Sequence, residues 1–131
     1  MRCALAFFAL CLVGCVATPK PLPAKNPEYQ QLSDIPVPRY FNFQSRDSLV
    51  LEEPFRSCRL HYDGPGWLRP PRVLEFYVQR MAAKEWKFIR SEGVDVAELV
   101  FRKGEEECRV RSVPTDDGES NLLTIEVRPA S

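Results

Sequence analysis

The sequence has little of what catalysis or nucleic-acid binding requires. Its 131 residues carry 18 basic and 18 acidic side chains. With no excess of positive charge, no overall field favours a nucleic acid, and we expect no nucleic-acid partner. No serine stands in a Gly-x-Ser-x-Gly turn, and no Gly-x-Gly-x-x-Gly precedes a predicted helix, so the motifs of serine hydrolases and dinucleotide-binding enzymes are missing. We therefore predict a protein that is not an enzyme and uses no cofactor.

Histidine is equally scarce. The single histidine, His61, falls on the polar phase of a predicted strand, two residues before Asp63. Zinc sites use three or four closely held ligands, and one histidine with one nearby aspartate falls short of that number. We predict a surface histidine and no metal site.

The chain also lacks an apolar run long enough to span a membrane. The run at residues 4–13 is about half of the ~20 apolar residues that a transmembrane helix needs. Arg2 precedes this run and small residues follow it, which is the layout of a secretory signal. We predict that residues 1–14 are a signal peptide that is removed on export.

The signal ends in Leu12-Val13-Gly14-Cys15, which resembles the lipobox of bacterial lipoproteins: an aliphatic residue, a small or aliphatic residue, then glycine or alanine before an invariant cysteine. The resemblance implies that the Cys15 thiol receives a diacylglyceryl group, that a dedicated peptidase cuts after Gly14, and that the new amine is acylated. Acyl chains such as palmitate, at ~0.8 kcal/mol per buried methylene, would then hold the protein in a membrane. An ordinary cleaved signal is the alternative, but the sequence has no convincing Ala-x-Ala cleavage site.

The residue after this cysteine bears on localisation. An aspartate at that position resembles an inner-membrane retention signal in lipoproteins of enteric type, and here the residue is Val16. The resemblance therefore implies the outer membrane, with the protein facing the periplasm.

Residues 15–40 are rich in proline and poor in core-forming side chains. Six prolines stand at positions 19, 21, 23, 27, 36 and 38, which favours an extended chain. We predict a lipidated N-terminus followed by a flexible linker, which at ~3.1 Å per residue would reach about 70 Å at full extension. A proline-rich ligand for a recognition domain, centred on Pro19-Lys20-Pro21-Leu22-Pro23, is the alternative.

From residue 41 onward, alternating apolar and polar residues indicate strands. One helix is predicted over residues 71–85, because Pro70 and Pro71 suit a helix start and Arg80 and Lys84 suit its end. Short turns join the later strands as an antiparallel meander. The strands are predicted at residues 48–51, 56–63, 86–91, 96–103, 107–113 and 122–128. The fold class is therefore α+β: a single domain, residues 41–131, with an antiparallel β-sheet packed by one α-helix in the order β-β-α-β-β-β-β.

The predicted helix has two distinct sides. At ~100° per residue, the side expected to pack on the sheet holds Leu74, Tyr77, Val78, Met81 and Ala82, with Val73 beside them. A basic strip with one aromatic lies next to it and consists of Arg72, Phe76, Arg80 and Lys84. This strip is either a solvated flank with Phe76 against the sheet edge or a site for acidic protein or glycan groups. We predict that any partner contact uses it.

The two tryptophans differ in context. Trp86 begins a predicted strand beside the end of the helix, and we expect it in the core. Trp67 follows the turn Gly64-Pro65-Gly66 and is either a core residue or an exposed contact residue.

Only two cysteines remain for the domain once Cys3, Cys11 and Cys15 are assigned to the leader and the processing site. These two, Cys58 and Cys108, are both inward-phased on predicted strands, and exported proteins fold in an oxidising compartment. We predict a disulfide between them, which would close a loop of about 50 residues and contribute on the order of 4 kcal/mol. Buried free thiols are the alternative.

A second set of segments consists of Phe76-Tyr77, Met81, Trp86, Leu99-Val100-Phe101-Arg102-Lys103 and Cys108-Arg109-Val110. Together they resemble a pattern in small bacterial envelope lipoproteins that have no known activity: phenylalanine-tyrosine, methionine, glycine-tryptophan, then a strand with apolar-Phe-x-Lys. Here Glu85 replaces the glycine before tryptophan. We therefore expect the corner between helix and strand to differ from the pattern.

These observations support three hypotheses of function. The first is a membrane-anchored envelope lipoprotein whose domain is a binding or structural module without chemistry of its own. The second is an accessory subunit of an envelope membrane-protein assembly, and the third, more distant, is an enzyme. The predicted partners are the membrane, through the lipid on Cys15, and an envelope protein or glycan.

Overall fold

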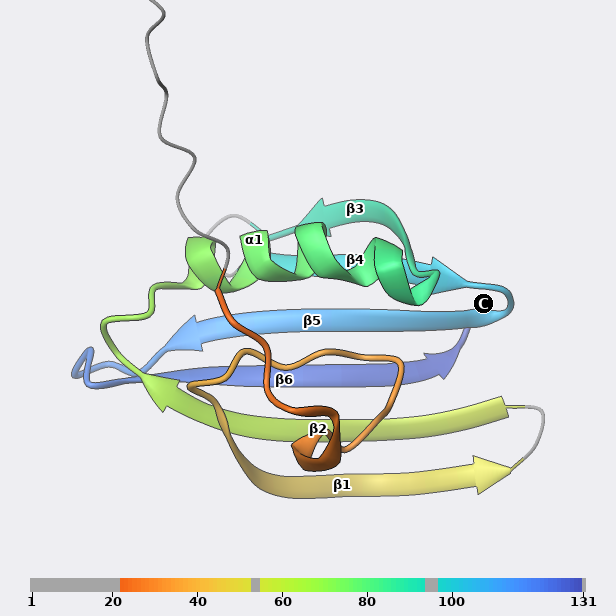
Figure 1. Cartoon of the computed structure of the whole chain (residues 1–131), viewed down its shortest axis with the longest axis horizontal. Helices are drawn as coiled ribbons and strands as arrows, with labels where there is room; N and C mark the ends of the chain where they lie inside the picture. The colour runs from red at the N-terminus through yellow and green to blue at the C-terminus, as the bar shows by residue number, and fades with distance from the viewer. Residues whose placement is uncertain (1–21, 53–54, 94–96, 131) are drawn as a thin grey trace, which may run out of the picture.

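The computed structural model describes residues 22–52, 55–93 and 97–130. Within them, six antiparallel strands form one sheet in the order β1-β2-β6-β5-β4-β3, and one α-helix, α1, packs on one face of it (Figure 1). The strands are β1 (Asn42–Glu52), β2 (Phe55–Pro65), β3 (Lys87–Glu92), β4 (Ala97–Lys103), β5 (Glu106–Pro114) and β6 (Ser120–Pro129). The helix is α1 (Pro70–Arg80), and two short 3₁₀ helices are η1 (Pro27–Tyr29) and η2 (Met81–Lys84).

The alternation of side chains explains this sheet. In β2, Cys58, Leu60 and Tyr62 are buried while the residues between them face the other side, and β6 repeats the pattern with Leu123, Ile125 and Val127. Strands β3 to β6 form a meander, and β6 then pairs with β2. The chain therefore crosses from β2 to the far edge of the sheet through α1. The predicted antiparallel sheet with one helix, in the order β-β-α-β-β-β-β, is confirmed.

The helix is shorter than predicted. It ends at Arg80, and η2 carries the chain on to Glu85, whose backbone is left-handed at φ 68°. This conformation suits glycine, because a Cβ atom crowds the neighbouring carbonyl there. Glu85 therefore adopts a conformation that costs less for glycine than for other residues. The expected difference between this corner and the lipoprotein pattern stays a prediction.

The buried side of α1 is also rotated from the predicted one. Val73, Phe76 and Tyr77 are buried on α1, whereas Val78 is 50% exposed. Ala82, the last member of the predicted face, is exposed as well. The reason is a second layer of chain beside the helix, which covers the side on which Phe76 lies.

This second layer is residues 22–40, which we call the strap. Leu22, Ile35 and Val37 belong to the same buried cluster as the helix and sheet, with exposures of 7%, 1% and 1%. The strap folds back on itself, since Lys25 N donates to Val37 O at 2.8 Å and Arg39 N to Pro23 O at 2.9 Å. The predicted flexible linker is therefore wrong over residues 22–40, and the domain begins at least as early as Leu22. Residues 15–21 of that linker lie outside the described residues.

The width of the sheet explains why the strap is needed. Helix α1 packs on β4 and β5, which leaves the inner side chains of β2 and β6 without a helical cover. The strap lies beside α1 over this remaining part of the sheet (Figure 1). Its prolines fix φ and so lower the conformational entropy lost when an extended segment is ordered. Composition alone makes such a segment look like a linker.

Polar contacts hold the strap in two places, at Asp34 in its C-terminal half and at Leu22 at its N-terminal end. Asp34 accepts hydrogen bonds from Arg56 at 2.9 and 2.6 Å and from Lys103 at 3.0 Å, and its carbonyl accepts from Trp86 Nε1 at 3.0 Å. Burial opposes ionisation of the Asp34 carboxyl, but the hydrogen bonds from Arg56 and Lys103 outweigh it and hold its pKa below the usual value. At the N-terminal end, Arg80 Nη2 donates to Leu22 O at 2.7 Å.

Candidate binding surface

The two domain cysteines cannot form the predicted disulfide. Cys58 on β2 and Cys108 on β5 both pair with Val127, from opposite sides of β6. Two strand spacings therefore separate their Cα atoms, or about 10 Å, beyond the ~7 Å limit for a disulfide. Both are buried free thiols, and burial raises the pKa of each. The prediction is wrong because side-chain phase indicates the face of a sheet but not which strands are neighbours.

The predicted contact strip on the helix is partly covered by the strap. Phe76 is 1% exposed, and the Arg80 guanidinium lies over its ring, 5.0 Å from the centroid, while it holds Leu22. Arg72 and Lys84 lie on the exposed surface, but the aromatic residue that made the strip a candidate site belongs to the core. The prediction of a partner site centred on Phe76 is therefore wrong, because the strap occupies that flank.

The other singled-out residues divide between core and surface. Trp86 is 2% exposed, as expected of a core residue. Trp67 is 65% exposed, so of its two alternatives it is the exposed residue and not a core residue. His61 is partly exposed on β2, with Nδ1 3.4 Å from Thr124 Oγ1. Among the described residues, no group of three or more side chains could hold a metal ion. Cys15 and the lipobox lie outside the part of the chain that the structure describes.

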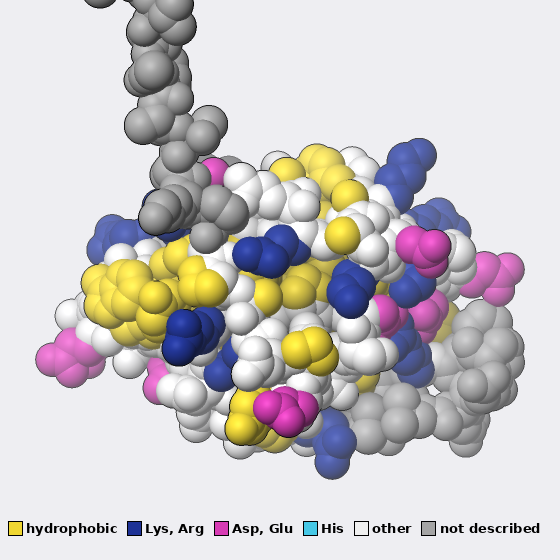
Figure 2. Space-filling model, in the orientation of Figure 1, with side chains coloured by type: hydrophobic (Ala, Val, Ile, Leu, Met, Phe, Trp, Pro, Cys, Tyr) yellow, Lys and Arg dark blue, Asp and Glu magenta, His cyan; other side chains and the backbone are white. Residues whose placement is uncertain are grey.

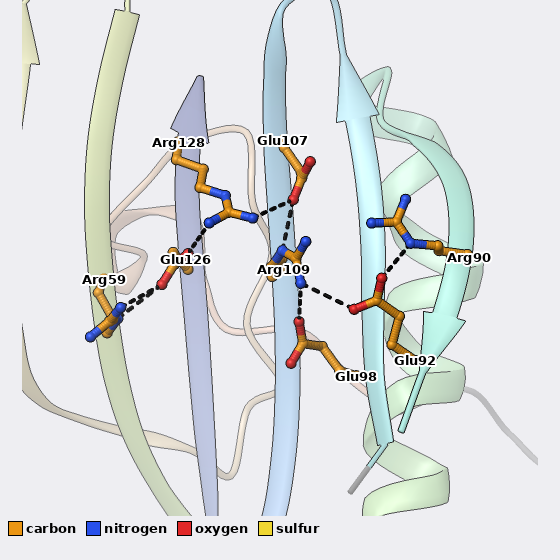
Figure 3. A network of polar contacts seen from close by, with 8 residues as sticks. All are labelled: Arg59, Arg90, Glu92, Glu98, Glu107, Arg109, Glu126 and Arg128. Carbon is orange, nitrogen blue, oxygen red and sulfur yellow. Dashed lines mark hydrogen bonds and ion pairs between the residues drawn. The ribbon is translucent and has the colours of Figure 1, made fainter. Parts of the chain in front are cut away.

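The face of the sheet opposite α1 carries a ladder of ion pairs (Figure 3). At its centre, Arg109 Nε donates to Glu107 at 2.7 Å, and Arg109 Nη1 reaches Glu98 at 2.9 Å and Glu92 at 3.1 Å. Burial opposes ionisation of Glu107, but its hydrogen bonds from Arg109 and Arg128 lower its pKa overall. The full ladder consists of Arg59, Arg90, Arg109 and Arg128 with Glu92, Glu98, Glu107 and Glu126. Its carboxylates are thus engaged within the protein.

Beneath these charged side chains, one apolar residue is sealed from solvent. Val100 pairs with Arg109 on one side and with Arg90 on the other, and it is 1% exposed although it lies outside the main core cluster. The stems of the two arginines can cover apolar surface while their charged groups stay in solvent. At the centre of this face, the protein's own arginine side chains therefore cover the apolar surface.

A pair of exposed aromatic rings stands at the end of the molecule where β2 leads into α1. Tyr40, at the end of the strap, is 41% exposed, and Trp67 is 65% exposed. Their ring centroids are 5.1 Å apart and the rings meet edge to face at 71°. We call this pair the aromatic corner. Figure 2 shows hydrophobic side chains gathered at this end of the molecule, on the left of the view.

The loop that carries Trp67 is held in place on both sides. Gly66 N donates to Glu119 O at 3.0 Å and Leu68 N to Pro65 O at 3.1 Å. The buried Asn121 side chain donates to the carbonyls of Pro65 and Leu68. Gly66 is required here, because a Cβ atom at this position would lie 2.0 Å from the Gly118 carbonyl oxygen. Trp67 is therefore presented to solvent by a fixed backbone, so a ligand would find its indole already positioned.

A shallow depression of about 430 Å³ adjoins the aromatic corner. Its wall includes four polar side chains that make no hydrogen bond or ion pair with any described residue: Asn42, Asp63, Glu119 and Ser120. The remaining lining residues are Tyr40, Gly64, Pro65 and Trp67. Unlike the carboxylates of the ion-pair ladder, those of Asp63 and Glu119 are available to a ligand.

A second depression, of about 460 Å³, lies on the face of the sheet opposite α1, which we call the open face. It holds Arg111, an exposed cation without an ion pair in the described part of the chain, together with His61 and Leu122. The two depressions are neighbours, because Asp63 in the first pairs across the strands with Leu122 in the second. The surface thus continues from the aromatic corner onto the open face.

Sequence reasoning found only part of this surface. The sequence leaves Trp67 open between a core residue and an exposed contact residue, whereas Tyr40 is missed because it falls in the predicted linker. The polar phase of β2 and the turn between β5 and β6 contain Asp63 and Glu119. Neither signals a site until the pairing of β2 with β6 brings them to one end of the sheet.

Comparison of this chain with protein families, curated proteins and solved structures found no match. In the described residues, no helix has the length and apolar character needed to cross a membrane.

Proposed function

We propose that this chain is a lipid-anchored lipoprotein of the bacterial envelope whose single domain is a non-catalytic binding module, and that the module binds through the aromatic corner and the adjoining depression. The observation that carries the proposal is the exposure of Trp67 and Tyr40 on a fixed loop beside unpaired polar side chains. Tryptophan and tyrosine dominate the energetics of binding surfaces, and a positioned aromatic loses little entropy when a ligand arrives.

The anchor is proposed at Cys15, from the lipobox resemblance. Six residues lie between Cys15 and Leu22, where the fold has already begun, so seven residue steps join the two. At ~3.5 Å per residue, this tether spans at most about 25 Å. The strap therefore supports a domain held close to the lipid surface. A linker that continued to residue 40 would instead leave the domain far from the membrane. The outer membrane, with the domain facing the periplasm, is proposed from Val16 after the lipobox cysteine.

The absence of chemistry is proposed from the state of the reactive groups. Burial raises the pKa of both domain thiols, which disfavours the thiolate that a nucleophile requires. The carboxylates of the open-face ladder are paired with arginines, and such pairing keeps them ionised and engaged rather than poised to transfer protons. Both features support a binding role.

Site-specific photo-crosslinking in cells tests the binding surface. A photoreactive phenylalanine analogue is placed at Trp67 and, as a matched control, at Val78, which is also exposed but lies on α1. We expect crosslinked material from position 67 and none from position 78. Equal crosslinking from both positions, or none from position 67, would contradict the proposed surface. One stoichiometric membrane protein at position 67 would instead favour the accessory-subunit hypothesis.

The anchor is tested separately. Cys15→Ser should abolish incorporation of an alkyne-palmitate label and shift the protein out of the detergent phase. Equal labelling of variant and wild type would rule out Cys15 as the lipidated residue.

A further inference from the structure

We propose that the ligand of the aromatic corner is a polysaccharide built of pyranose rings. Within the bacterial envelope this means the glycan strands of peptidoglycan, an identification that rests on the proposed function above. The inference is carried by the pairing of two exposed aromatic rings with four unengaged hydrogen-bonding side chains in one depression.

The aromatic corner matches one side of a pyranose ring. Such a ring has faces made of C–H groups and a rim of hydroxyls, so it can stack on a flat aromatic face while its rim stays polar. The Trp67 indole offers a face of that size, 65% exposed. The Tyr40 ring, at 71° to the indole, adds a second exposed aromatic surface next to it. Aromatic surfaces of this kind give a large contact area to ligands with one apolar and one polar side.

The polar rim of the depression matches the hydroxyls. Asp63 and Glu119 are acceptors for hydroxyl protons, and hydrogen bonds to charged acceptors are stronger than neutral ones. Asn42 can both donate and accept, and Ser120 can do the same. A sugar rim, in which every hydroxyl is a donor and an acceptor, is the ligand chemistry that satisfies such a mixed set.

The same residues disfavour a lipid surface. Aromatic residues beside lysine and arginine are typical of segments that dock on anionic bilayers. Here the charged side chains that line the depression are the carboxylates of Asp63 and Glu119, which anionic headgroups would repel. The sugar backbone of a glycan strand carries no phosphate, so it avoids most of this repulsion.

The continuous surface also predicts a preference for chain length. Asp63 connects the first depression to the one that holds Leu122, His61 and Arg111. A ligand stacked at the aromatic corner can therefore extend onto the open face if it has further sugar units. We expect affinity to rise from N-acetylglucosamine to its tetramer.

Tryptophan fluorescence gives a direct assay, because the chain has two tryptophans in opposite environments. Trp86 is 2% exposed and inaccessible to acrylamide, so quenching reports Trp67. The mature-length protein carrying Cys15→Ser retains every described residue and is titrated with N-acetylglucosamine tetramer. We expect the sugar to protect Trp67 from quenching, and purified peptidoglycan sacculi to co-sediment the protein.

Three variants complete the test, with sedimentation on sacculi as the readout. Trp67→Ala should weaken binding at least tenfold and Asp63→Asn a few-fold. Tyr29→Ala, which removes an exposed aromatic ring outside the depression, should leave binding unchanged. Circular dichroism confirms that each variant is folded.

Two outcomes would overturn the inference. One is sedimentation that Trp67→Ala leaves intact, together with no protection by the tetramer. The other is protection of Trp67 by vesicles that contain anionic phospholipid but not by sugar, which would make the corner a membrane contact. Neither outcome bears on the lipid labelling of Cys15, which tests the anchor separately. Crosslinks from position 67 to a protein would still support a binding module but would contradict a glycan ligand.

Discussion

Removal of the strap tests the most consequential feature of this fold. A chain that begins at Phe41, the boundary that composition indicates, loses Leu22, Ile35 and Val37 from the core. Fully burying such a side chain contributes about 1.5–3 kcal/mol, so the three contribute about 5–9 kcal/mol. Domains of this size have a free energy of unfolding of only about 5–15 kcal/mol. We therefore expect the chain from Phe41 to be largely unfolded at 25 °C.

The measurement is urea unfolding followed by near-ultraviolet circular dichroism and by the emission of Trp86, whose indole N–H bonds to the strap at Asp34. Because a truncated chain can fail for unrelated reasons, Ile35→Ala in the intact mature chain provides a graded test. It should lower the free energy of unfolding by about 2–5 kcal/mol. Tyr29→Ala, on the same strap but 64% exposed, should change it by less than about 0.5 kcal/mol.

The reasoning would be refuted if the chain from Phe41 unfolded at the same urea midpoint and with the same slope as the mature chain. In that case the domain would be complete without the strap, and the strap would contribute nothing to its stability. An unchanged midpoint for Ile35→Ala would lead to the same conclusion.

Three further predictions concern single positions. Cys58 and Cys108 should stay reduced, so the denatured mature-length protein carrying Cys15→Ser should show two reactive thiols without a reductant. Its urea midpoint should be unchanged by a reductant, and a lowered midpoint would indicate a disulfide. The lowered pKa of Asp34 means that its ionised form stabilises the fold above the unfolded value near 3.8 and that this contribution disappears as pH falls through the folded pKa. The free energy of unfolding of the wild type should therefore fall on acidification more steeply than that of Asp34→Asn. Parallel pH profiles of this free energy would contradict a stabilising role for the contacts of Asp34 with Arg56 and Lys103. Glu85→Gly should raise the free energy of unfolding by roughly 0.5–1 kcal/mol, because φ is 68° there, whereas Glu85→Ala should not.

The sequence predicted the sheet well because each strand carries its own evidence. Alternation in β2, β5 and β6 is local, and so are the turns at Gly104 and Gly118, both of which have positive φ. The order of the strands in space is not local. The pairing of β6 between β2 and β5 separates Cys58 from Cys108, and nothing in the phase of either cysteine reveals it.

The strap was missed for a related reason. Proline-rich segments with scattered apolar residues resemble linkers because they have no period of their own. The strap acquires its structure from the apolar side chains of the helix and sheet that it covers, and these come together only once α1 lies on β4 and β5. In retrospect, Ile35 and Val37 are a small apolar signal between prolines, and Asp34 beside them is the residue that ties the strap to Arg56 and Lys103.

Under the proposed anchor at Cys15, the strap also changes what the domain can reach. With a flexible linker to residue 40, 26 residue steps would join the proposed lipid site at Cys15 to the fold at Phe41; with the strap folded, seven steps join Cys15 to Leu22. For tethers of equal flexibility, effective concentration falls roughly as the −3/2 power of length, so this shortening raises the effective concentration near the membrane about sevenfold. The gain applies only to ligands that come within about 25 Å, plus the width of the domain, of the bilayer. A folded strap therefore favours partners that lie along the membrane surface, and it restricts the proposed glycan to strands that pass close to that surface.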